Sequence, residues 1–128
     1  MKAWEEFEKF IKEIAEYHGF HTEHRVIFKD DHGRSEIDVL AKRFDIILAI
    51  DAKRYTQGWY RASAIRREAK KHSERCKRFE KVIGKRVVPV IVSLIDDEIF
   101  KHEGCLIVSI DKFNDFLNNI HLYLEELA

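Results

Sequence analysis

One segment constrains the fold of this chain most strongly: residues 36–55, with the sequence EIDVLAKRFDIILAIDAKRY. Two apolar runs of strand length flank a short polar break, a pattern that favours two β-strands joined by a tight turn. We predict an antiparallel hairpin of residues 35–43 and 45–54 that reverses near Phe44 and Asp45. Each run also carries an aspartate, a residue that is rarely buried without a partner. The two aspartates of this hairpin are therefore expected to have a partner that offsets their charge.

Periodicity predicts the other elements. Apolar residues recur at spacings of three and four in three segments, which predicts helices over 4–18, 59–83 and 111–127. Apolar runs rich in β-forming residues predict strands over 20–29, 87–95 and 105–110. The predicted order is αβββαββα, an α/β fold with a mixed β-sheet flanked by helices. A chain of 128 residues fits a single domain over 1–128.

The sequence argues against a membrane or zinc-bound protein. It has no apolar run near the roughly 20 residues that span a bilayer, and its first residues lack the apolar core of a signal peptide. We expect a cytoplasmic protein without a membrane partner. Cys76 and Cys105 lie far apart, and the histidines show no zinc-binding spacing, which disfavours a disulfide framework or a zinc site. His72 falls in the apolar stripe of its helix and is expected in the core.

The net charge of zero hides an uneven distribution. Residues 51–86 contain 13 lysines and arginines against 4 acidic residues, whereas residues 1–23 and 95–128 are acidic. A basic block of this kind is the electrostatic footprint of a protein that binds phosphate backbones. It also fits a solvated helix face with neighbouring ion pairs, and this alternative stays open.

Two aspartates and a lysine converge in the predicted hairpin. Because side chains alternate along a strand, Asp51 and Lys53 point to one face. Asp38 lies opposite Asp51 if the hairpin is centred between residues 44 and 45, and directly opposed residues share a face. Two facing carboxylates repel unless a cation lies between them, and Mg²⁺ is the usual partner. The hairpin therefore predicts a metal site, although Lys53 could instead form a simple strand-end ion pair.

The first helix offers a third acid. On a helical projection starting from Trp4, Glu8 falls at the edge of the apolar arc, about 40° from Trp4. The other glutamates of this helix fall towards solvent. We expect Glu8 to face along the sheet towards the aspartates. An ordinary boundary glutamate is the alternative.

Together these residues resemble the PD-(D/E)XK nuclease superfamily, which has a restriction-endonuclease-like fold. The pattern is Asp38, then Asp51-Ala52-Lys53 on the next strand, after a helix that carries Glu8. It is most similar to the archaeal Holliday-junction resolvases, with Mrr-like restriction endonucleases as a second relative. The similarity covers about residues 5–95 and includes the helix acid 11 residues before a glycine and the interval of 13 between the aspartates.

This resemblance implies a DNA endonuclease that hydrolyses phosphodiester bonds with Mg²⁺ or Mn²⁺. Asp38 and Asp51 would hold the metal, with the Ala52 carbonyl as a further ligand and Glu8 acting directly or through a water. Lys53 would orient the attacking water and stabilise developing negative charge. The predicted catalytic set is thus Glu8, Asp38, Asp51 and Lys53.

The resemblance and the basic block also predict the DNA-binding surface. The candidate DNA contacts are Lys9, Arg25, Ser35, Arg54, Gln57, Arg61, Arg66 and Lys70. Backbone contacts of this type position a nucleic acid without reading its sequence. Because duplex cleavage by such nucleases usually needs two active sites, we expect a homodimer.

Several functions stay open at this point. The nuclease could be selective for junctions or branched DNA in repair and recombination, or it could be restriction-like. The same fold could instead be a nucleic-acid-binding module with weak or no catalytic activity. A structural or partner-binding domain would show neither metal binding nor salt-dependent DNA affinity.

Overall fold

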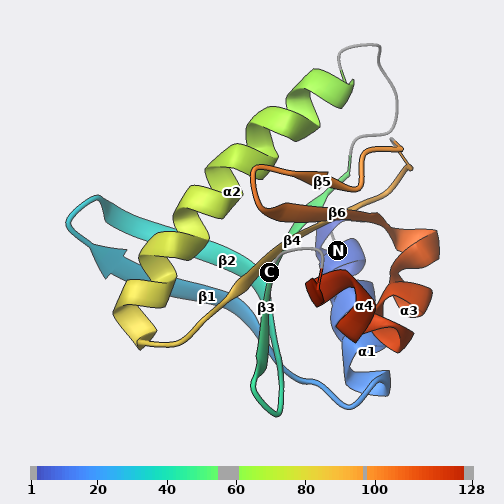
Figure 1. Cartoon of the computed structure of the whole chain (residues 1–128), viewed down its shortest axis with the longest axis horizontal. Helices are drawn as coiled ribbons and strands as arrows, with labels where there is room; N and C mark the ends of the chain where they lie inside the picture. The colour runs from blue at the N-terminus through green and yellow to red at the C-terminus, as the bar shows by residue number, and fades with distance from the viewer. Residues whose placement is uncertain (1–2, 55–60, 97, 126–128) are drawn as a thin grey trace.

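The computed structural model describes residues 3–54, 61–96 and 98–125 of the chain. Figure 1 shows a curved sheet with a long helix crossing one side and shorter helices on the other. The elements, in chain order, are α1 Ala3–Tyr17, β1 His21–Asp30, β2 Gly33–Arg43, β3 Ile46–Lys53, α2 Arg61–Ile83, β4 Val88–Ser93, β5 Lys101–His102, β6 Cys105–Ser109, α3 Ile110–Asn118 and α4 Ile120–Glu125. None of these helices is both long and apolar enough to cross a lipid bilayer.

The sheet is mixed, as predicted. Its strand order is β1-β2-β3-β4-β6-β5. The first three strands are antiparallel, β4 and β6 run parallel to β3, and β5 returns antiparallel to β6. The β2–β3 hairpin closes at Arg43↔Ile46, so its two-residue loop is Phe44 and Asp45, where the sequence predicted the reversal.

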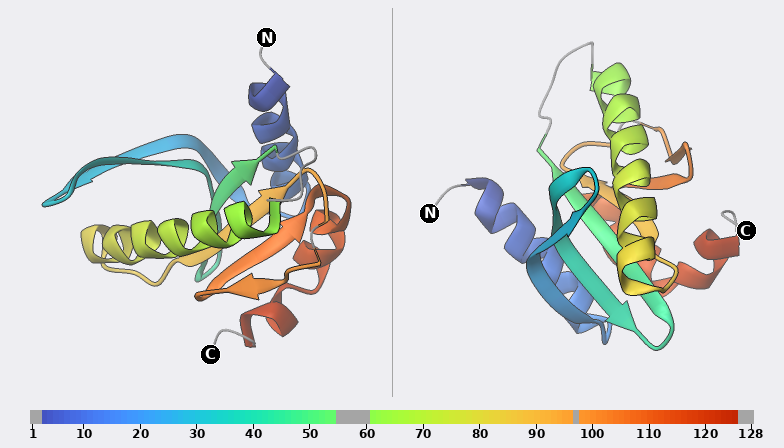
Figure 2. Two further views of the ribbon diagram at one scale, coloured as in Figure 1. Left: turned by 90° about the horizontal axis from the view of Figure 1, so that it is seen from above. Right: turned by 90° about the vertical axis from the view of Figure 1, so that its left-hand side faces the viewer.

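Helices cover both faces of the sheet (Figure 2). Helices α1, α3 and α4 share one core with the sheet, to which Ile11, Phe113 and Ile120 contribute. Helix α2 covers the opposite face through its stripe of Ile65, Ala69, Cys76 and Phe79, which meets strand residues in two further clusters. His72 lies in the same stripe and is fully buried, which confirms its predicted place in the core.

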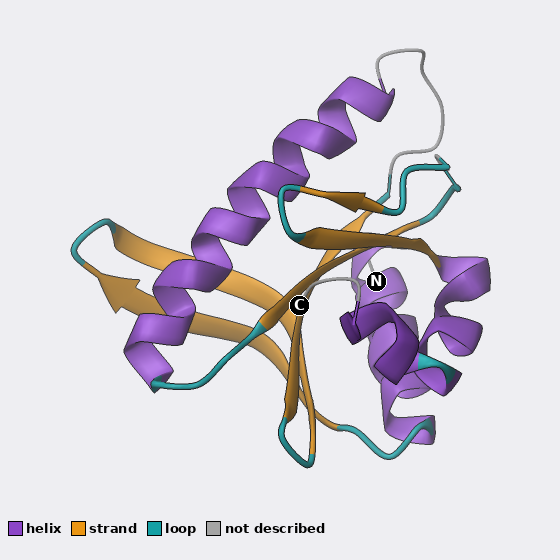
Figure 3. Ribbon diagram, in the orientation of Figure 1, coloured by secondary structure: helices purple, strands orange, loops and turns teal. Residues whose placement is uncertain are grey.

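The β1–β2 hairpin extends beyond the other strands, with α2 running alongside it (Figures 2 and 3). A tight turn at 31–32 joins its strands, and the Asp30 carboxylate accepts a hydrogen bond from the His32 backbone at 2.9 Å. Phe28 of β1 packs on Phe79 of α2, with ring centroids 5.0 Å apart. The β1–β2 hairpin and α2 therefore lie side by side and extend beyond the central strands of the sheet.

Two details differ from the prediction. The last helix is broken at Asn119, whose side-chain amide donates to the Asp115 carbonyl at 3.0 Å. This break lets α4 fold back so that Tyr123 packs on Phe116, with centroids 4.9 Å apart. Strand β5 was not predicted, because two residues are too short to show periodicity. It is held by a turn at Glu103 and Gly104, both with positive φ, a combination that suits a tight hairpin.

The β2–β3 turn gives a first testable prediction. Phe44 has φ of 54° and is 97% exposed, so its ring gains no burial for a backbone conformation that disfavours residues with a Cβ. Phe44→Gly should therefore stabilise the protein by about 1 kcal/mol in chemical unfolding. Phe44→Ala is the matched control, because it removes the ring and keeps the Cβ. Equal stability of the two variants would contradict this explanation.

Candidate active site

The two predicted aspartates meet where β2 and β3 run side by side. The observed ladder pairs Val39 with Ile50, and its next step brings Asp38 opposite Asp51. The backbone N–H of Ala52 donates to Asp38 Oδ2 at 2.9 Å, and the two carboxyl groups share a hydrogen bond. Asp51 is 5% exposed. The sequence-based register therefore places both acids correctly.

The sheet bends at Asp38. Ile37 packs in the α2-side core and Val39 in the α1-side core, although residues two apart on a regular strand share a face. Arg25, in the register position opposite Asp38 on β1, has φ of 55°. Backbone distortions of this kind cluster at functional sites because they re-aim side chains. Here the bend turns the long β1–β2 hairpin away from the core and opens space above the aspartates.

The electrostatics of the aspartate pair are asymmetric. Burial, together with the neighbouring Asp51 carboxylate, raises the pKa of Asp38 to about 7. Burial also acts to raise the pKa of Asp51, but the charges of Lys53 and Arg75 and the hydrogen bond from Asp38 outweigh it, so the pKa of Asp51 is lowered. Below about pH 7 the pair therefore holds one proton on Asp38, which can donate a hydrogen bond to Asp51. A cation placed between them would displace this proton.

Lys53 lies beside the pair and links it to α2. Its Nζ is 3.2 Å from Asp51 Oδ2 and 3.9 Å from Glu68 Oε1. Within the described part of the chain, Asp51 Oδ2 is nevertheless buried without a hydrogen bond of acceptable geometry. The alternative of a simple ion pair at the strand end thus describes this contact incompletely, since it leaves a buried carboxylate oxygen unsatisfied.

Arg75 approaches the same oxygen from α2, with its guanidinium 4.0 Å from Asp51 Oδ2. The Arg75 side chain donates to His72 Nδ1 at 3.1 Å, and His72 Nε2 donates to the Ala49 carbonyl at 2.8 Å. Burial lowers the pKa of His72, so its ring is neutral and can accept from Arg75. The buried histidine therefore ties α2 to β3 and orients Arg75.

Glu8 lies in the same cleft but is held by its own partners. It is buried, and its Oε1 accepts a hydrogen bond from His24 Nε2 at 2.7 Å. Arg25 is 3.5 Å from the same oxygen and stacks over the Trp4 ring, 4.2 Å from its centroid. The predicted position of Glu8, on the side of α1 that faces the sheet, is confirmed. Among the described residues, however, no group of three or more Asp, Glu, His or Cys side chains is arranged to hold a metal.

These side chains line a cleft of about 680 Å³ between the β1–β2 hairpin and α2, which we call the acidic cleft. Glu8, Asp38 and Asp51 lie among its lining residues, and basic side chains from three elements surround them. These basic residues are Arg25, Arg34, Lys71, Arg75 and Arg78. Negative charge buried below a basic rim suits a ligand that brings both phosphate groups and a divalent cation.

The predicted DNA contacts divide into three groups. Arg25 and Ser35 line the acidic cleft. Four predicted contacts are exposed but do not line it: Lys9, Arg54, Arg66 and Lys70. Gln57 and the side chain of Arg61 lie outside the described residues.

Sequence reasoning missed the residues of α2 that do line the cleft. Lys71, Arg75 and Arg78 share one helix face, next to the buried stripe, whereas Arg66 and Lys70 fall on the face turned away from the cleft. Only part of the signal was present. The sequence did not show that Lys53 lies on the α2 side of the sheet, where it contacts Glu68. With that side known, helical spacing picks out the basic residues next to the buried stripe as those able to face the cleft.

The donor set fits a hard divalent cation. Two carboxyl groups converge, and one oxygen of Asp51 is buried without a hydrogen bond. Mg²⁺ commonly uses one or two protein carboxylates and keeps waters on its other positions, so a pair suffices, whereas Zn²⁺ would need imidazole or thiolate ligands. A direct role for Glu8 and for the Ala52 carbonyl stays a prediction.

The aspartate pair predicts a distinct pH dependence of stability. The pKa of Asp38 is higher in the folded protein than in the unfolded chain. As the pH rises from the unfolded-state pKa towards 7, the aspartate ionises only in the unfolded chain, and the free energy of unfolding therefore decreases. Asp38→Asn removes this loss. In EDTA, its stability relative to wild type should therefore increase between pH 5 and pH 8, by on the order of 1–2 kcal/mol.

Thermal and urea unfolding at both pH values measure this difference. Asp45→Asn, an exposed position in the turn of the same hairpin, is the control and should show no such change. A pH-independent difference between Asp38→Asn and wild type would contradict the shared proton.

Comparison with known proteins identifies a close relative. No protein-family model matches the chain. An uncharacterized protein of Archaeoglobus fulgidus is 53% identical over 125 residues, which are 98% of this chain and 97% of the relative. This chain belongs to the same family. The relationship spans nearly the whole of both proteins, so the two share one fold.

Solved structures identify the type of fold. The crystal structure of AF1548, a protein of unknown function, is 25% identical with a TM-score of 0.53 over 68% of this chain, and the match spans 46% of AF1548. The small subunit of the heterodimeric restriction endonuclease R.BspD6I has a TM-score of 0.50 at 13% identity, and the match covers 96% of this chain and 86% of the subunit. The fold is therefore restriction-endonuclease-like, as predicted.

Proposed function

We propose that this protein is a nuclease of the PD-(D/E)XK type, which hydrolyses phosphodiester bonds of DNA with Mg²⁺ or Mn²⁺. The observation that carries the proposal is the Asp38–Asp51 pair in a basic-rimmed cleft. Asp51 is buried and Asp38 half-buried, and Lys53 lies 3.2 Å from an oxygen of Asp51 that has no hydrogen bond among the described residues. The restriction-endonuclease-like fold supports the same conclusion. A purely structural domain has no evident use for a buried carboxyl group placed directly against a second, half-buried one.

In this proposal Asp38 and Asp51 hold the divalent ion. When bound, the ion would offset the charge of the scissile phosphate and make a nearby water more acidic. Lys53 donates a hydrogen bond to the attacking water or to a phosphoryl oxygen, where negative charge develops. Glu68, 3.9 Å from Lys53, restrains the ammonium group next to Asp51.

The rim of the cleft positions the DNA. Lys71, Arg75 and Arg78 present positive charge from α2, and Arg34 does so from the β1–β2 hairpin. Glu8 is a positioning residue in this arrangement, because it holds His24 and Arg25 at the base of the hairpin. Binding through these residues should be strongly salt-dependent and insensitive to sequence.

Cleavage of both strands of a duplex by such nucleases usually uses two active sites, and we propose that the protein acts as a homodimer. The R.BspD6I small subunit belongs to a heterodimeric enzyme, a precedent for assembly in this fold. Sedimentation or light scattering with and without DNA tests the oligomeric state.

The test of the proposed function is cleavage of a labelled panel that contains duplex, single-stranded, flap and four-way-junction DNA, with Mg²⁺, Mn²⁺ or EDTA. Metal-dependent cutting is the expected result, and the preferred substrate distinguishes resolvase-like from restriction-like activity. Salt-sensitive binding without cutting would instead support a catalytically inactive nucleic-acid-binding module. Neither binding nor cutting would overturn both interpretations.

A further inference from the structure

A second pocket, separate from the acidic cleft, lies where β6 runs into α3. It has a volume of about 170 Å³ and is lined by aromatic and aliphatic side chains. These are Ile99, Phe100, Ile107, Phe116 and Tyr123, and we call this site the aromatic pocket. Tyr123 packs against both other rings, with centroids 5.2 Å from Phe100 and 4.9 Å from Phe116. A volume of this size accommodates one flat ring system.

Ser109, one of the residues that line the aromatic pocket, carries an unsatisfied hydroxyl group. Ser109 is 4% exposed, and its Oγ is buried without a hydrogen-bond partner. Ser109 is the N-cap of α3, yet its side chain makes no capping hydrogen bond. A buried hydroxyl without a partner is costly, so a ligand that supplies a partner gains affinity from it.

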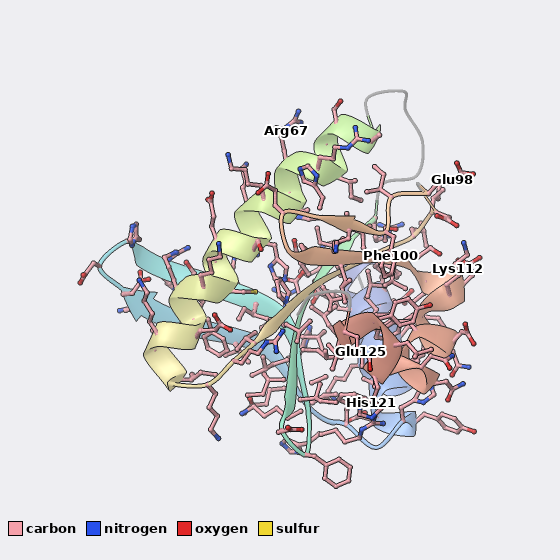
Figure 4. The ribbon with its side chains drawn as sticks, in the orientation of Figure 1. Arg67, Glu98, Phe100, Lys112, His121 and Glu125 are labelled. Carbon is pink, nitrogen blue, oxygen red and sulfur yellow. The ribbon has the colours of Figure 1, made fainter. Side chains whose placement is uncertain are left out.

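Charged groups of both signs also line the aromatic pocket. Figure 4 shows Glu98, Phe100 and Lys112 close together on the side of the molecule that carries α3. Lys112 donates to the Asp96 carboxylate, which also accepts from the Glu98 backbone. Carboxylates accept hydrogen bonds from N–H groups on the edge of a heterocycle, and the aromatic side chains provide stacking surfaces for its face.

The sheet register brings this pocket close to the proposed catalytic residues. Lys53 pairs with Ser93 of β4, and Ser93 pairs with Ser109 of β6. Ser109 is therefore two strands from Lys53, about 10 Å at the usual strand spacing. One or two nucleotides of an extended DNA strand span that distance. None of the residues that line the aromatic pocket lines the acidic cleft.

We propose that the aromatic pocket binds a single unpaired nucleobase of the DNA substrate, next to the nucleotide whose phosphate lies at Asp38 and Asp51. This inference rests on the proposed function for the position of the scissile phosphate. The base would stack on Phe100 and Tyr123 and hydrogen-bond to Ser109 Oγ. A base can reach the pocket from single-stranded or unpaired DNA, because a paired base stays within its stack.

A short single-stranded DNA that contains 2-aminopurine tests the proposal, in EDTA so that cleavage does not interfere. The fluorescence of this base falls when it stacks on an aromatic ring. We expect quenching with wild type, and about tenfold weaker binding with both Phe100→Leu and Ser109→Ala. Phe44→Leu is the control, because it makes the same change at an exposed ring outside both sites.

Thermal unfolding separates ligand binding from folding. Because Ser109 Oγ has no partner among the described residues, Ser109→Ala should leave the melting temperature unchanged or higher. If both pocket variants quench and bind like Phe44→Leu, the nucleobase proposal is wrong, even when metal-dependent cleavage is observed. If quenching depends on Phe100 but no substrate is cut, the pocket proposal holds and the nuclease proposal fails. The absence of any DNA binding would overturn both.

Discussion

Asp51→Asn is expected to abolish metal-dependent DNA cleavage, with a rate at least about a thousandfold below that of wild type. Asp51 is the more buried member of the carboxyl pair, and the oxygen that it leaves unsatisfied is the one best suited to a cation. The asparagine side chain keeps the shape and loses the charge. Calorimetric titration with Mn²⁺, which requires no DNA, should show that metal binding is lost as well.

The fold of this variant should survive, because the substitution removes a charge that faces a second carboxyl group. Far-ultraviolet circular dichroism and thermal unfolding check this point. Asp45→Asn carries the same chemical change in the exposed turn of the same hairpin and should cut DNA at the wild-type rate. Full cleavage by folded Asp51→Asn would remove the aspartate pair from the mechanism.

Lys53→Ala should have the second largest effect, a loss of about 10²- to 10³-fold in cleavage rate. The lysine does not hold the metal, so Mn²⁺ affinity should stay the same or increase when the positive charge beside Asp51 is removed. DNA affinity should fall much less than the rate, since many other cations line the cleft. Single-turnover cleavage with saturating enzyme separates the rate from binding.

Lys42→Ala is the matched control for this experiment. Lys42 is an exposed sheet lysine, 3.8 Å from Glu23, in the type of surface ion pair that contributes little. It should leave cleavage unchanged. If Lys53→Ala cuts as fast as Lys42→Ala, then Lys53 is merely an ion-pair partner of Asp51, and the chemistry depends on other groups.

The local pattern of the hairpin was sufficient to predict the centre of the site. Two apolar runs and a two-residue break specify a register, and that register brings Asp38 opposite Asp51. Helical periodicity similarly placed Glu8 on the sheet side of α1 and His72 in the core. These predictions succeeded because each depends on one repeating backbone geometry and on neighbours close in the chain.

Other features depend on contacts between distant segments. The break at Asn119 allows Tyr123 to pack on Phe116, and the bend at Asp38 allows Ile37 and Val39 to join cores on opposite faces of the sheet. No local pattern contains either fact. The helical repeat continues through Asn119 in the sequence, although the chain turns there.

The sequence by itself determined the order of the longer elements, the hairpin register and the acids at its centre. The tertiary structure decided which basic residues join those acids. Lys71, Arg75 and Arg78 lie on the cleft side of α2 because the buried stripe of this helix fixes its rotation on the sheet. The tertiary structure also decided that Arg25 contacts Glu8, and that the aromatic pocket forms at a strand two positions along the sheet from the strand of Lys53. The physical reason is that charge composition is a property of the chain, whereas the direction in which each charge points is set by how the helices dock on the sheet.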